Sequence, residues 1–172
     1  ETARQLLRHR GLLATLVARD LKGRYRGSAL GFLWSLVQPL LLLAVYSLVF
    51  GGIFQQRITG AEPYPLFLLC GLFPWIWFAT GLTEGTVSLV ANAGLIRRAV
   101  FPSEILPVVP VIANLVHLLL ALPVLAAGLV IGYLQGAPVG GWGALALPLV
   151  VALELPLVAG LALALAALHA HF

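Results

Sequence analysis

Residues 19–50 read RDLKGRYRGSALGFLWSLVQPLLLLAVYSLVF, a basic segment that leads directly into an apolar stretch long enough to cross a lipid bilayer. Seven of the ten Lys and Arg residues in the 172-residue chain precede Leu30. This placement is typical of a membrane protein whose basic flank lies at an anionic lipid surface. The net charge of +4 therefore indicates membrane lipids, and not nucleic acid, as a partner.

The composition of the whole chain also indicates a membrane environment. The sequence is 61% hydrophobic and 9% charged, whereas soluble domains are roughly 25% charged. Apolar stretches long enough to span a bilayer as helices occupy residues 30–54, 65–90, 108–134 and 144–168. Helices are expected because lipid offers no hydrogen-bond partner to an open backbone. The predicted fold is an all-α membrane protein with four transmembrane helices in one domain, residues 1–172.

The basic residues also predict how the chain is inserted. Arg97 and Arg98 lie between the second and third apolar stretches, and only Arg57 falls in the other two connections. By the positive-inside rule, the N-terminus and the loop at residues 91–107 are cytoplasmic.

The segment before the first apolar stretch has the pattern of an amphipathic helix. Over residues 4–27, leucines and valines recur at helical spacing with basic residues between them. Such a helix is expected to lie in the headgroup region, although an ordinary basic flank that only sets topology has the same composition. Asp20 and Arg24 are four residues apart, the spacing of a weak helical ion pair.

Pairs of glycines four residues apart predict close helix packing. They are Gly27 with Gly31, Gly81 with Gly85, and Gly128 with Gly132. Without side chains at these positions, the backbones of two helices can approach one another closely.

Two blocks of the sequence resemble a known family. The first is residues 19–50, in which a basic RDLK-x-RY-x-x-S segment leads into LG-x-LW. The second, residues 71–107, contains GLFPWIWF and then NAGLIRRAVFPSEILP. In this order and spacing, both blocks resemble the type-2 ABC permeases that export O-antigen, capsule or teichoic acid.

The resemblance implies a larger assembly than this chain. Members of the family are six-span permeases of the bacterial cytoplasmic membrane, and they pair as homodimers on two ATPase subunits. A lipid-linked glycan passes between the two permeases. Four apolar stretches are present here and the sequence contains no methionine. We therefore expect this chain to be part of a longer protein whose C-terminal third it does not include.

The chain itself has no sequence signature of a nucleotide site. Its only lysine, Lys22, lacks the glycine-rich loop before it and the Ser or Thr after it that a P-loop requires. No cofactor, metal ion or catalytic residue is therefore expected in this chain, and ATP and Mg are expected on the partner subunit.

The resemblance implies that the 91–107 loop contacts the ATPase. Arg97 and Arg98 would supply charge, Phe101 a hydrophobic anchor, and Pro102, Ser103 and Glu104 a helix start. The alternative is that the two arginines only enforce topology.

Two further sets of residues are candidates for substrate contact. The arginines of the N-terminal helix suit a lipid pyrophosphate because guanidinium presents a planar fork, and they are Arg19, Arg24 and Arg26; contact with ordinary anionic lipid is the alternative. The aromatic residues of the second apolar stretch suit a glycan channel, and they are Phe73, Trp75, Trp77 and Phe78. An interfacial belt is their alternative role, and Trp75 and Trp77 should point to different sides of the helix.

The sequence is also compatible with other functions. Export of teichoic acid or a drug by a related permease is one alternative. An intramembrane transferase would use Glu154 and His117 as an acid–base pair, and a channel would need oligomerisation to build a ring from Glu154. Glu84 has either a structural or gating role, or it simply reaches interfacial water.

Overall fold

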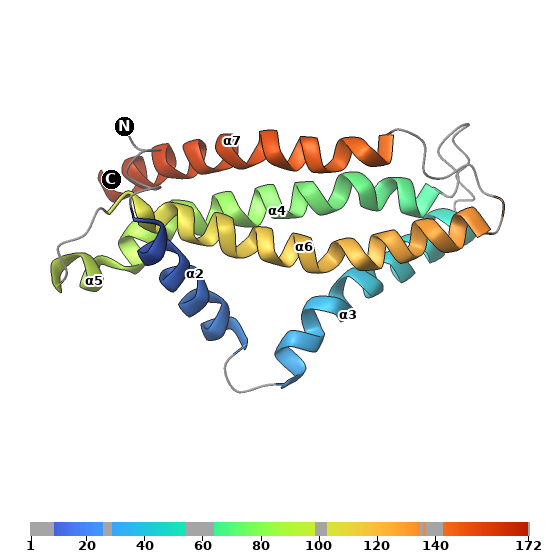
Figure 1. Cartoon of the computed structure of the whole chain (residues 1–172), viewed down its shortest axis with the longest axis horizontal. Coiled ribbons are helices and arrows are strands. Elements are labelled where there is room, and N and C mark those ends of the chain that lie inside the picture. The colour runs from blue at the N-terminus through green and yellow to red at the C-terminus, as the bar shows by residue number, and fades with distance from the viewer. Residues whose placement is uncertain are drawn as a thin grey trace. The chain divides into compact units, whose positions relative to one another are not determined.

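All secondary structure in the described part of the chain is helical. The computed structural model describes residues 9–25, 29–53, 64–98, 103–134, 136 and 143–171. The elements are α2 (Arg10–Tyr25), α3 (Ala29–Tyr46), the π-helical η1 (Ser47–Ile53), α4 (Tyr64–Ala91), α5 (Ala93–Arg98), α6 (Ile105–Leu134) and α7 (Gly143–His171) (Figure 1). The predicted all-α fold is confirmed for these residues.

Three helices are long and apolar enough to cross a membrane. Their apolar parts are Leu66–Ala91 in α4, Ile105–Leu134 in α6 and Ala146–His171 in α7. A shorter apolar segment, Leu40–Ile53, covers the end of α3 and all of η1. The helices therefore occupy the four predicted stretches, while a crossing by the first of them stays a prediction.

The first apolar stretch was expected to be a uniform α-helix, and the structure differs from this expectation. Its last seven residues, Ser47–Ile53, widen into a π-helix that contains Gly51 and Gly52. Glycine tolerates irregular backbone conformations because it has no Cβ. The two adjacent glycines therefore explain why the helix can widen at this end.

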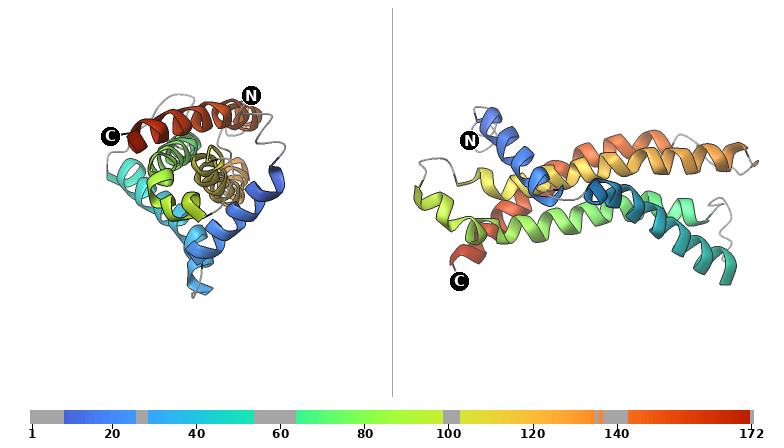
Figure 2. Two further views of the ribbon diagram at one scale, coloured as in Figure 1. Left: turned by 90° about the vertical axis from the view of Figure 1, so that its left-hand side faces the viewer. Right: turned by 90° about the horizontal axis from the view of Figure 1, so that it is seen from below.

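The chain forms two compact units, and α4, α6 and α7 each contribute to both. Unit 1 comprises Glu1–Arg26, Trp77–Val116 and Leu153–Phe172, and unit 2 comprises Gly27–Ile76 and His117–Ala152. Within unit 1, α2 lies across the first part of α6 (Figures 1 and 2).

The apolar face of α2 packs against protein in unit 1. Leu16 and Val17 are buried in a cluster with Ile105, Leu106 and other residues at the start of α6. Leu12, Leu13 and Leu21 extend this contact, at the three- and four-residue spacing of one helix face. The leucine pattern that predicted an amphipathic helix thus serves to attach α2 to α6.

The Gly81–Gly85 pair permits close helix packing in unit 1. A Cβ atom added at Gly85 would lie 2.8 Å from the Cβ of Ala162 in α7 and 3.0 Å from the carbonyl oxygen of Pro107 in α6. At Gly81 the nearest atoms are the Cα of Val111 and a methyl group of Val158. This confirms the predicted close approach at this pair.

In unit 2, the buried positions of α4 and α6 are occupied mainly by large apolar side chains. The buried residues recur at helical spacing in the first part of α4 and the second part of α6, and they are Leu66, Leu69, Phe73, Leu118, Ala121 and Leu125. Gly128 lies against the side chain of Leu66. Gly27 lies outside the described residues.

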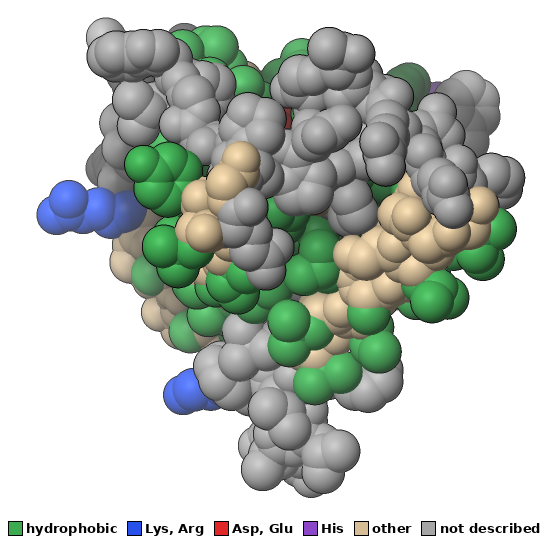
Figure 3. Space-filling view, turned by 90° about the vertical axis from the view of Figure 1, so that its right-hand side faces the viewer, with side chains coloured by type: hydrophobic (Ala, Val, Ile, Leu, Met, Phe, Trp, Pro, Cys, Tyr) green, Lys and Arg blue, Asp and Glu red, His purple; other side chains and the backbone are tan. Residues whose placement is uncertain are grey.

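Many large apolar side chains on these helices are exposed. They include Leu119, Val130 and Ile131 on α6 and Leu149, Leu153 and Leu157 on α7. Hydrophobic side chains also predominate among the coloured side chains in Figure 3. So many exposed large apolar side chains are unusual on a soluble monomer and suit contact with lipid.

Replacing Gly85 by alanine should destabilise the protein. The added methyl group would meet a Cβ and a backbone oxygen, neither of which can rotate away, so α4 must separate from α6 and α7. The expected loss is about 1–3 kcal/mol, measured as a lower unfolding midpoint of the full-length protein in detergent.

Gly160→Ala in α7 is the matched control, because nothing lies within 4 Å of an added Cβ there. This change should be neutral or stabilising by up to about 1 kcal/mol. An unfolding midpoint of Gly85→Ala equal to that of Gly160→Ala would contradict the close packing.

Candidate functional site

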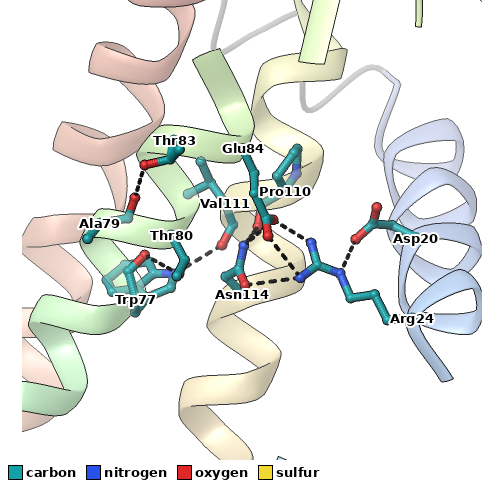
Figure 4. Close-up of polar contacts among 10 residues, drawn as sticks. All are labelled: Asp20, Arg24, Trp77, Ala79, Thr80, Thr83, Glu84, Pro110, Val111 and Asn114. Atoms are coloured by element: carbon teal, nitrogen blue, oxygen red, sulfur yellow. Dashed lines mark hydrogen bonds and ion pairs between the residues drawn. The ribbon is translucent and has the colours of Figure 1, made fainter. Parts of the chain in front are cut away.

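A polar cluster connects α2 with α4 and α6 in unit 1. Its centre is the Arg24 guanidinium, near the C-terminal end of α2 (Figure 4). The Nε atom donates to Asp20 on the same helix at 2.8 Å. The two terminal nitrogens donate to the Glu84 carboxylate in α4, NH2 at 2.5 Å and NH1 at 3.3 Å. Arg24 therefore bridges a carboxylate of its own helix and a carboxylate of a membrane-spanning helix.

Asn114 of α6 completes the cluster. Its amide nitrogen donates to Glu84 Oε2 at 2.7 Å and to the Pro110 carbonyl oxygen at 2.9 Å, and its amide oxygen accepts from Arg24 NH1 at 3.3 Å. Asn114 is buried, 7% exposed, whereas the Glu84 side chain is 40% exposed. Asn114 and Arg24 NH2 thus share Glu84 Oε2, while Arg24 NH1 donates to Oε1.

The predicted ion pair between Asp20 and Arg24 is confirmed. Burial by itself lowers the pKa of Arg24, but the hydrogen bonds that it donates to Glu84 and Asp20, and the charges of both carboxylates, raise its pKa above the ordinary value. Arg24 is therefore a permanent cation between two carboxylates. Because most of its donors already have protein acceptors, the cluster is suited to joining helices.

Sequence reasoning did not predict the contact of Arg24 with Glu84 and Asn114. Glu84 was identified as a charged residue inside an apolar stretch, for which a partner is the usual expectation. Asn114 offered a similar signal, as a single amide in the apolar start of α6. Neither residue could be matched to Arg24, 60 and 90 positions away, without the fold.

The aromatic candidates separate into buried and exposed side chains. Trp77 is 2% exposed, and its Nε1 donates to the Val111 carbonyl oxygen of α6 at 3.0 Å. Trp75 is 61% exposed and Phe73 is buried, while Phe78 is partly buried. The prediction that Trp75 and Trp77 point to different sides of the helix is confirmed.

The 91–107 segment contains a short helix. Arg97 and Arg98 lie in the last turn of α5, and Ser103 and Glu104 form an exposed turn directly before α6. The Leu106 amide donates to the Ser103 carbonyl oxygen at 3.1 Å, so the predicted helix start is present. Phe101 and Pro102 lie outside the described residues.

Among the described residues, Arg19 and Glu154 are not part of the polar cluster. Arg19 is exposed on α2, and Arg26 lies outside the described residues. In α7, the Oε2 atom of Glu154 is buried and has no hydrogen-bond partner among the described residues.

Comparison with known proteins gives a consistent result. Residues 11–172 match the family model described as ABC-2 type transporter. A protein of Myxococcus xanthus, described as O-antigen export system permease protein RfbA, is 39% identical over 170 residues, which are 98% of this chain and 62% of that protein.

Two further relatives are more distant. A Klebsiella pneumoniae protein with the same description is 37% identical over 132 residues, 77% of this chain and 50% of that protein. The polysialic acid transport protein KpsM of Escherichia coli is 30% identical over 90 residues, 52% of this chain and 34% of that protein. The chain thus spans less than two thirds of the length of these curated relatives.

The Arg24–Glu84 contact should give a measurable coupling energy. We expect Arg24→Ala and Glu84→Gln to be less destabilising together than the sum of the two changes, by about 0.5–1 kcal/mol, because each removes the same ion pair. The measurement is a double-mutant cycle on unfolding of the full-length protein in detergent.

Lys22→Ala combined with Glu84→Gln is the control cycle, since Lys22 is an exposed cation on the same helix. Its two changes should add. Equal coupling in the two cycles would show that Glu84 responds to the charge of α2 in general, contrary to the specific contact.

Proposed function

Because the chain belongs to the ABC-2 type transporter family, we propose that it forms part of the membrane subunit of an ATP-driven exporter. Its substrate is a lipid-linked polysaccharide such as O-antigen, moved outward across the bacterial cytoplasmic membrane. The observation that carries this proposal is the 39% identity to an O-antigen export permease across 98% of the chain. The similarity to a polysialic acid transport protein supports the broader substrate class of envelope polysaccharides.

The proposed topology has four crossings in this chain, with α3 and η1 forming the first. The 25 residues of Ala29–Tyr46 and Ser47–Ile53 together make a helix about as long as the hydrocarbon core requires. With its basic residues, α2 then lies at the cytoplasmic surface, and α5 lies on the same side.

The α5 segment is proposed to receive the movement of a separate ATPase subunit. Ser103 and Glu104 lead directly into α6, whose first turns contact α4 at Gly85 and Trp77. Because closely packed helices transmit displacement with little compression, a push on this segment would reach α4 through α6. Two copies of the permease and two of the ATPase would then alternate between two states, with ATP and Mg bound on the ATPase.

Substrate contacts are proposed for the exposed members of the candidate sets. The exposed indole of Trp75 offers a flat face to sugar rings, and Arg19 is exposed for contact with a lipid pyrophosphate. Trp77 is instead proposed to stabilise the packing of α4 against α6, because its ring is buried and hydrogen-bonded.

Replacing both arginines of α5 should weaken the contact with the ATPase. In the full-length protein, Arg97→Ala with Arg98→Ala is expected to weaken association with the cognate ATPase at least about tenfold, because loss of one central interface residue costs more than about 1 kcal/mol and about 1.4 kcal/mol is a factor of ten in affinity. Association is measured by titration of purified ATPase against permease in nanodiscs.

Arg10→Ala with Lys22→Ala removes the same charge from α2 and is the matched control. Its affinity for the ATPase should stay within about twofold of wild type, because exposed charges outside an interface contribute little. An equal loss of ATPase affinity in both double variants would mean that Arg97 and Arg98 act only through the total charge of the permease.

Export itself is tested in a bacterium whose own O-antigen export permease has been deleted. The full-length protein, expressed with its ATPase, should restore O-antigen at the cell surface, which is measured by antibody labelling of intact cells. An ATPase variant that cannot hydrolyse ATP is the control. If cells with the wild-type permease and ATPase kept all of their O-antigen inside, with none at the surface, this result would contradict the proposed function.

A further inference from the structure

The attachment of α2 differs between its two ends. Towards its N-terminal half, Leu16 and Val17 are buried in an apolar cluster with α6. Beyond Leu21, the last residue of α2 that packs on this apolar cluster, the attachment is the polar contact of Arg24 with Glu84 and Asn114. The Arg24 side chain is 28% exposed and that of Glu84 is 40% exposed, so water reaches this second attachment.

The polar attachment can open without leaving either charged group without a polar partner. Asp20 is on the same helix as Arg24 and binds a different nitrogen, Nε, from the two that bind Glu84. If the C-terminal end of α2 moved away from α4, Arg24 would keep Asp20 as its partner. Glu84 would keep the hydrogen bond from Asn114 and its contact with water.

The remaining partners of Arg24 and Glu84 lower the free energy needed to open the contact. Separation of a buried ion pair normally leaves an uncompensated charge, whereas an exposed pair contributes little. In this cluster both partners retain a neutralising or hydrogen-bonding neighbour after separation. Of the two attachments, the polar contact between α2 and α4 therefore costs less to open than the apolar contact of Leu16 and Val17.

We infer that Arg24 and Glu84 form a latch that holds the C-terminal end of α2 on α4 and α6 and opens during turnover. Asp20 is the positioning residue of this latch: it keeps Arg24 neutralised in the open state. Opening releases the C-terminal end of α2, which leads into α3 in the chain, while the N-terminal half of α2 stays attached. The part of this inference that concerns turnover rests on the proposed function.

Removing the Glu84 carboxylate and removing the Asp20 carboxylate should shift the equilibrium between open and closed latch in opposite directions. Glu84→Gln removes the charged acceptor on α4, so the closed state loses its ion pair and the latch opens. Asp20→Asn removes the partner that Arg24 keeps in the open state, and it also relieves repulsion between Asp20 and Glu84 in the closed state. Asp20→Asn should therefore favour closure, although both variants remove one carboxylate beside the same arginine.

The test is hydrogen exchange, followed by mass spectrometry, on the full-length permease with its ATPase in nanodiscs. Three segments are compared: residues 18–25, residues 10–17 and residues 105–116. Without nucleotide, Glu84→Gln and Arg24→Ala should accelerate exchange of residues 18–25 about two- to fivefold, as expected for loss of an exposed ion pair. Arg24→Lys, which keeps the positive charge but not the planar guanidinium, should increase the exchange rate of these residues less.

The same readout tests opening during turnover. With ATP and a hydrolysis-deficient ATPase, wild-type exchange of residues 18–25 should rise to the level of Glu84→Gln, and that variant should show no further rise. Asp20→Asn should show a smaller ATP-dependent rise than wild type. Residues 10–17 and 105–116 should keep their wild-type exchange in every case.

The possible failures are distinguishable. Exchange that rises in all three segments of Glu84→Gln would mean that Glu84 only stabilises the fold, and unchanged exchange in residues 18–25 would exclude the latch. An equal response of Asp20→Asn and Glu84→Gln would overturn the role of Asp20. Because the nucleotide-free comparison does not depend on transport, failure of the proposed function would appear separately, in the surface labelling of O-antigen.

Discussion

The close approach of α4 to α6 and α7 at Gly85 is the constraint on which the rest of unit 1 depends. Helices in lipid gain little from the hydrophobic effect on association, so their packing relies on short contacts between small residues and on a few polar bonds. At Gly85 the backbone of α4 comes close to Pro107 and Ala162 because no side chain intervenes. This approach brings Trp77 to the Val111 carbonyl oxygen and Glu84 to the Asn114 amide.

Position along these helices determines what each polar group does. Trp77 and Asn114 are buried, and each donates to the other helix: Trp77 to the Val111 carbonyl oxygen of α6, and Asn114 to Glu84 Oε2 of α4. Glu84 lies on the same helix as Trp77 but is partly exposed, so it can accept from a residue of another element. Buried donors thus stabilise the helix pair, and the exposed carboxylate connects that pair to α2.

The helices could be predicted from sequence and the polar cluster could not, for a physical reason. Runs of apolar residues such as 108–134 determine a helix through local backbone requirements, and α6 accordingly covers Ile105–Leu134. The Gly81–Gly85 pair and the Asp20–Arg24 pair are local patterns as well, and both were predicted. The Arg24–Glu84 contact joins residues 60 positions apart, and no local pattern indicates which of several arginines is the partner.

The partners of Arg24 also change how its chemistry should be interpreted. From sequence, Arg24 was one of three arginines suited to a lipid pyrophosphate, and a guanidinium fork binds phosphate and carboxylate oxygens equally well. In the structure that fork holds Glu84, and Asp20 occupies Nε. Two carboxylates beside one cation give the cluster a net negative charge, which repels a pyrophosphate for as long as both remain in place. A lipid contact of Arg24 therefore stays a prediction, whereas its contacts with Asp20 and Glu84 set the position of α2 relative to α4.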